Sequence, residues 1–131
     1  MSQSRQELGR WGEAHAAEYL VDQGYTIVAR NERTPYGEID LVVQKVCGPT
    51  AESRESQELL VFVEVKTRTS QSFGYPEEAV TPRKQINLIS AAQHYLQEHP
   101  DLDLDWRIDV ISIERYPDRA PIIHHFDNAL R

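Results

Sequence analysis

A run of apolar residues that ends in charge constrains this sequence more than any other feature. Residues 59–69 read LLVFVEVKTRT. The first five are apolar without alternation, which is typical of a strand that is buried on both faces at the centre of a layered sheet. Glu64 and Lys66 follow on one side of the strand, with the apolar Val65 between them. Because buried charge is expensive, these two residues need a chemical reason to be there.

The remaining pattern predicts an α/β protein in which helices flank a mixed sheet. Thr81 and Pro82 form a typical N-cap and N1 pair for the second helix, and Gly24 is a typical residue to end the first. Ile86, Ile89, Ala92 and Leu96 are predicted as the inward stripe of the second helix. The expected helices span residues 3–23 and 81–98. The expected strands span residues 25–31, 38–46, 59–67 and 106–114, and the tail, 120–131, could add a short fifth one. The turn is placed at 34–37, and loops at 48–58 and 70–80.

The size and composition favour a single domain over residues 1–131. The formal net charge is −7, which argues against a protein that coats nucleic acid through bulk electrostatics. One cysteine excludes an internal disulfide and a cysteine-based zinc cluster. No apolar run approaches the roughly 20 residues that a membrane span needs, and the start of the chain lacks an apolar signal core. We therefore expect a cytoplasmic protein that does not bind membranes.

The second and third strands are expected to form a hairpin that brings two acids together. If the connecting loop is symmetric, Val46 faces Glu58, and the same register places Asp40 opposite Glu64. A slip of one residue would put the two carboxylates on opposite faces. Two facing carboxylates repel each other, so a cation between them is the expected remedy.

Two further polar side chains share the inward stripes of the helices. Glu13 lies in line with the small apolar residues of the first helix, and Gln85 in line with the stripe of the second. Clustered carboxylates suit Mg²⁺ or Mn²⁺, which accept phosphate oxygens and activate a bound water. Lys66 could orient or deprotonate that water, or stabilise the charge that develops on phosphorus. Asp40, Glu64, Glu13 and Lys66 thus form a set suited to phosphodiester hydrolysis.

Plainer interpretations exist for each residue. Glu64 and Lys66 could be an exposed pair at a strand end, Asp40 a turn-closing acid, and Glu13 an acid favoured by the helix dipole. Four basic residues could hold phosphates, although solvated charge is the favoured interpretation for each: Arg30, Arg33, Arg68 and Lys84. Asp109 interrupts another apolar strand, where a structural pairing with Arg107 is the favoured interpretation.

At this point the motifs resemble a known family. GEID at 37–40 followed by EVK at 64–66 resembles the split PD-(D/E)xK signature of the restriction-endonuclease-like superfamily, with Ile39 where the superfamily often has proline. The ordered set GRWGE, GYTIVARNER, GEIDLV, VFVEVKTR and EAVTPRKQ is similar to the YraN family of small bacterial proteins, which is related to archaeal Holliday-junction resolvases. This resemblance covers nearly the whole chain.

The resemblance implies a restriction-endonuclease-like core in the order α-β-β-β-α-β and an Mg²⁺- or Mn²⁺-dependent endonuclease acting on DNA, including branched or junction DNA. It implies that Asp40, Glu64 and Glu13 bind metal and that Lys66 is the catalytic lysine, and it implies a homodimer. Nucleic acid would be contacted by Arg33, Arg68, Lys84 and Gln85. The alternative is a non-catalytic module of nuclease ancestry that binds nucleic acid or a repair protein; the protein partner is unknown.

Overall fold

The computed structural model describes residues 4–48, 57–69 and 80–130. Two helices and five strands follow one another as α1 (Arg5–Asp22), β1 (Thr26–Thr34), β2 (Gly37–Cys47), β3 (Gln57–Thr69), α2 (Pro82–Glu98), β4 (Asp105–Tyr116) and β5 (Arg119–Leu130). The predicted mixed α/β architecture and element order are confirmed. The predicted loops at 48–58 and 70–80 fall mostly outside the described residues. Within these residues, no helix combines the length and apolar character that crossing a membrane requires.

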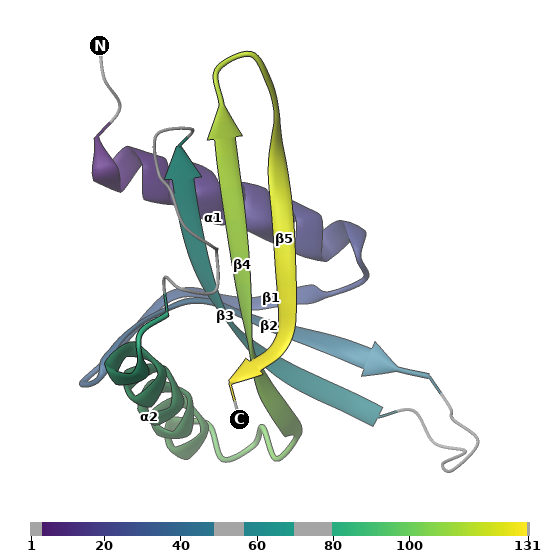
Figure 1. Cartoon of the computed structure of the whole chain (residues 1–131). Coiled ribbons are helices and arrows are strands. Elements are labelled where there is room, and N and C mark those ends of the chain that lie inside the picture. Colours follow the sequence, from purple (N-terminus) through teal and green to yellow (C-terminus); the bar gives the residue numbers. More distant parts are fainter. Residues whose placement is uncertain (1–3, 49–56, 70–79, 131) are drawn as a thin grey trace.

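The five strands form one sheet in the order β1-β2-β3-β4-β5. Pairing is antiparallel except between β3 and β4, which run parallel because α2 connects them as a crossover. The β2–β3 register pairs Leu41 with Val63 and Val46 with Glu58, as the sequence predicts. Figure 1 shows α1 and α2 on opposite faces of the sheet.

The central strand β3 is buried on both faces, as its sequence predicts. Val61, Val63 and Val65 pack with α1 in one core cluster. Leu60 and Phe62 pack with α2 in the other cluster. Each face of β3 therefore contributes to a separate apolar core.

Local signals fix the helix boundaries. Ser4 Oγ accepts a hydrogen bond from the Glu7 N–H at 3.1 Å and caps α1. Thr81 Oγ1 accepts from the Lys84 N–H at 3.2 Å and caps α2. Gly24 has φ 96°, the positive value that glycine adopts at low cost just after a helix end.

The predicted orientation of α2 is partly wrong. The buried residues of α2 are Leu88, Ala91, Ala92 and Tyr95, whereas Ile86 is 64% exposed. The ring of Tyr95 packs edge-on against Phe62 of β3, with 5.7 Å between ring centroids. Both sets of residues have helical spacing, so spacing alone does not determine which side of α2 is buried. The contact between Tyr95 and Phe62 favours burial of the side that contains Leu88 and Tyr95.

Candidate metal and phosphate site

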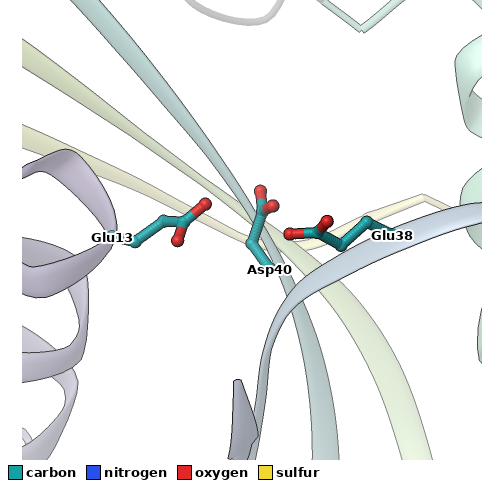
Figure 2. Close-up of side chains that lie close together, drawn as sticks. All are labelled: Glu13, Glu38 and Asp40. Atoms are coloured by element: carbon teal, nitrogen blue, oxygen red, sulfur yellow. The ribbon is translucent and has the colours of Figure 1, made fainter. Parts of the chain in front are cut away.

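Three carboxylates meet where α1 approaches the start of β2. One oxygen each from Glu13, Glu38 and Asp40 lies within 4.8 Å of the others. Figure 2 shows Asp40 between the other two, with Glu13 reaching across from α1. Hard divalent cations bind carboxylate oxygens at about 2.0–2.6 Å, so opposite ligands lie up to roughly twice that distance apart. The cluster can therefore accommodate such an ion after small side-chain rotations.

Asn31 of β1 connects two of these acids. Its Nδ2 group donates to Glu13 Oε2 at 2.9 Å and to Glu38 Oε1 at 2.8 Å. Its backbone has φ 51°, a left-handed conformation that asparagine tolerates better than most residues. The Asn31 amide gives each of the two carboxylates one hydrogen bond and holds Glu13 and Glu38 on either side of Asp40.

Asp40 is the most perturbed acid of the group. Burial, followed by the charge of Glu64, raises its pKa from 3.8 to about 8, and the charge of Glu13 adds to the rise. A hydrogen bond from the Val65 N–H to Asp40 Oδ2, 2.8 Å long, acts in the opposite direction. Near neutral pH Asp40 is therefore mostly protonated, and binding a cation there would displace the proton.

The predicted approach of Asp40 to Glu64 depends on the register of the hairpin. The paired register ends at Leu41 and Val63, and Asp40 and Glu64 come next on the two strands. Their closeness is evident from the charge of Glu64, which raises the pKa of Asp40. Both acids line one cavity between the β1–β2 turn and α2. The tertiary structure thus brings together Asp40, Glu64 and Glu13, as expected from the sequence.

Glu64 is only 5% exposed and is paired with two lysines. Its Oε1 lies 3.3 Å from Lys66 Nζ and 2.8 Å from Lys84 Nζ. Burial and the neighbouring Lys84 lower the pKa of Lys66, although Glu64 acts against them. Burial also opposes the charge on Lys84, but its hydrogen bonds with Glu64 and Lys66 and the charges of Glu64 and Asp40 together outweigh burial and raise the pKa of Lys84. The two amines are therefore inequivalent, and Lys66 is the one more readily present as a neutral amine, the form that can take up a proton.

Further cations surround the acids despite the negative net charge of the chain. A cavity of about 440 Å³ between α1 and β1 contains Glu13 and Glu38 together with Arg10 and Arg33. A second cavity, of about 340 Å³, is lined by Glu13, Lys66 and Arg5. The cavity beside α2 contains Arg83 and Lys84. The site as a whole thus combines carboxylates with cations that could hold phosphates.

One of the predicted nucleic-acid contacts, Gln85, is placed away from the acids. Gln85 lies on another cavity, together with Val110 and Phe126, and its Nε2 donates to Val80 O at 3.2 Å. The structure therefore does not bring Gln85 to the acids, because α2 turns that side chain towards β4 and β5. Arg68 is half-buried on β3, two residues beyond Lys66.

Sequence reasoning missed Glu38 and Asn31. Glu38 had a usable signal, because it precedes Asp40 by two residues and alternate residues of a strand share a face. Asn31 had no comparable signal, since its role depends on a positive φ in β1 and on α1 lying close by.

A second polar group lies apart from this site. Asp109 is fully buried and accepts hydrogen bonds from Arg107, from His125 and from the Asn128 N–H. Burial tends to raise the pKa of Asp109, but the hydrogen bonds from His125 and Arg107 lower it overall. The predicted structural pairing of Asp109 with Arg107 is confirmed, at 2.9 Å.

Fold and site together define an α/β protein whose mixed sheet carries a carboxylate cluster beside a lysine pair. The chain belongs to the family described as Uncharacterised protein family UPF0102, whose model matches residues 12–113. The predicted membership of this family of YraN-like bacterial proteins is thereby confirmed. The matched stretch contains each acid and both lysines of the candidate site.

Bacterial relatives match over most of their length. The chain is 45% identical over 124 residues to a UPF0102 protein of Syntrophotalea carbinolica, covering 95% of this chain and 92% of the relative. It is 48% identical over 123 residues to one from Syntrophomonas wolfei, covering 94% and 96%. A UPF0102 protein of Anaeromyxobacter dehalogenans is 41% identical over 125 residues, covering 95% and 84%.

Proposed function

We propose that this protein is a metal-dependent endonuclease that hydrolyses phosphodiester bonds of DNA, including branched DNA, and that its sheet and helices form a restriction-endonuclease-like core. The single observation that carries the proposal is the carboxylate cluster of Glu13, Glu38 and Asp40, reached within the same site by the Glu64–Lys66–Lys84 group. An all-oxygen donor set of this kind favours Mg²⁺ or Mn²⁺.

Each residue of the site has a defined role in the proposed reaction. Glu13, Glu38 and Asp40 would hold the ion, and Glu64 would extend the set from β3. A bound ion would supply a water of lowered pKa and would offset charge on the phosphate. Lys66, whose pKa is lowered, accepts a proton from the attacking water. Lys84 stays protonated and pairs with negative charge beside Glu64.

The surrounding cations support a nucleic-acid substrate. Arg33 lies near the acids on the β1 side, and Lys84 lies near them on the α2 side. Positive side chains on both sides suit a strand whose phosphates continue beyond the bond that is cut. In this proposal Arg33, Arg68 and Lys84 contact the backbone of DNA, and a homodimer would cut the two strands of a junction symmetrically.

Cleavage of defined DNA substrates tests this proposal. Linear, flapped and four-way junction DNA are incubated with Mn²⁺ or Mg²⁺ and the products are resolved on denaturing gels. We expect cleavage by the wild type and its loss in Lys66→Ala and Asp40→Ala, with Glu18→Gln on the exposed side of α1 as the matched control. Cleavage that survives Lys66→Ala would refute the assigned chemistry.

The Asn31 contacts favour a second candidate, a non-catalytic module that binds nucleic acid or a repair protein. Because Asn31 already donates to Glu13 and Glu38, these acids have a partner without a cation. This candidate predicts binding of the same DNA substrates with no cleavage in any metal, and a melting temperature that does not respond to Mn²⁺.

A further inference from the structure

The cavity between the β1–β2 turn and α2 has features that hydrolysis alone does not require. It measures about 410 Å³, within the range of small-molecule sites, and Asp40 and Glu64 line one part of it. The rest of its lining is chemically different. Tyr36 comes from the turn, and Leu88 and Ala91 come from α2.

Tyr36 presents an aromatic ring to this cavity. Its side chain is 51% exposed. The turn holds its backbone, since the Tyr36 N–H donates to Thr34 Oγ1 at 3.1 Å. The ring also meets His94 of α2 at a centroid distance of 6.3 Å and an angle of 65°. Tyr36 is thus anchored at its backbone and along one part of its ring, while about half of the side chain remains available to a ligand.

The α2 wall of the cavity combines apolar surface with polar groups at its rim. Leu88 and Ala91 are buried against the sheet, so the wall they form is apolar. Asn87 is exposed and offers both a donor and an acceptor. Arg83 and Lys84 add positive charge. An aromatic ring, an apolar wall, an amide and two cations match the parts of a nucleotide, with the base against Tyr36 and the phosphate towards Arg83 and Lys84.

We propose that this cavity receives a single unstacked nucleobase adjacent to the phosphate that is cut, with Tyr36 as its stacking platform. The inference rests on the proposed nuclease function and narrows its substrate to strands that are unpaired or distorted at the cleavage position. Flipping a base out of the stack of an intact duplex costs a few kcal/mol, whereas flaps and junctions contain bases that are already unstacked and cost less to bind.

Binding measurements test the base pocket independently of cleavage. The probe is fluorescein-labelled single-stranded oligothymidylate of about 15 nucleotides, within the span of known single-strand sites. Its partner is a fully abasic oligomer of equal length and charge. Anisotropy is followed in EDTA, where metal-dependent cutting does not occur, with wild type, Tyr36→Ala and Tyr36→Phe. Circular dichroism verifies that each variant is folded.

We expect the wild type to bind the base-containing oligomer more tightly than the abasic one by about 5- to 160-fold, as one base–aromatic stack provides. Tyr36→Ala should abolish this preference, and Tyr36→Phe should keep it because phenylalanine retains the ring. Equal binding of both oligomers by the wild type, or a preference that Tyr36→Ala leaves intact, overturns the inference.

The same variants separate this inference from the nuclease proposal. Lys66-dependent cleavage without a Tyr36-dependent base preference overturns the base pocket and leaves the nuclease intact. A Tyr36-dependent preference without cleavage in Mn²⁺ or Mg²⁺ supports the pocket and overturns hydrolysis.

Discussion

Asp40→Asn removes a carboxyl group that the folded protein keeps protonated near neutral pH. The pKa of Asp40 is about 8 in the fold, against 3.8 for an ordinary aspartate, because of burial and the nearby charges of Glu64 and Glu13. At pH values between these two pKa values, the folded state binds more protons than the unfolded state. The stability of the wild type therefore falls as the pH rises through this interval, and the stability is fully regained only below it.

The size of the effect follows from this interval. Each pH unit in this interval lowers the unfolding free energy by about 1.4 kcal/mol for one such group, so the interval sets a ceiling of about 6 kcal/mol. Water can enter the cavity that Asp40 lines, which reduces the cost of ionisation. Between about pH 5 and pH 8 we expect Asp40→Asn to gain roughly 1–4 kcal/mol of unfolding free energy relative to the wild type.

Urea unfolding followed by circular dichroism measures this difference. The wild type and Asp40→Asn are kept in EDTA at about pH 5, 6.5 and 8 and are compared with Glu18→Gln, which changes an exposed acid on the solvent side of α1. The advantage of Asp40→Asn should grow with pH, and that of Glu18→Gln should not. If the unfolding free energies of wild type and Asp40→Asn changed with pH in parallel over this range, the raised pKa assigned to Asp40 would be refuted. In a separate series without EDTA, Mn²⁺ should stabilise the wild type and leave the stability of Asp40→Asn unchanged.

Three further predictions concern other parts of the molecule. Glu38→Gln should raise the Mn²⁺ concentration that half-saturates thermal stabilisation by at least about tenfold, and an unchanged midpoint would exclude Glu38 as a ligand. Gly12→Ala should destabilise by about 1–3 kcal/mol or more in urea, because its Cβ would overlap the Thr67 side chain; Gly9→Ala, with open space, should gain about 0.5–1 kcal/mol. Asp109→Ala should cost about 3–5 kcal/mol at neutral pH, and a loss below about 1 kcal/mol would show that its buried hydrogen bonds contribute little.

Much of the fold was predictable because its signals are local. Thr81, Pro82 and Gly24 mark helix ends through the chemistry of their own backbone and side chains. The apolar run before Glu64 indicates a central strand, since only such a strand is buried on both faces. The β2–β3 register was also predictable, and with it the meeting of Asp40 and Glu64.

Other features depend on contacts between distant segments. The rotation of α2 is one, because two overlapping apolar stripes satisfy the helical period and the packing of Tyr95 on Phe62 favours one of them. That rotation directs Lys84 to Glu64 and Gln85 to another cavity. The C-terminal strand is also longer than expected, since β5 extends over Arg119–Leu130 in pairing with β4.

By itself, the sequence determined which residue types could do chemistry and on which strand faces they lie. The tertiary structure alone decided that α1 brings Glu13 to the acids of β2, that Asn31 bridges Glu13 and Glu38, and that Tyr36 faces α2 across a cavity. The reason is physical: alternation and capping act over a few neighbouring residues. The distance between side chains of α1, the β1–β2 turn and α2 is set only when these elements pack against the same sheet.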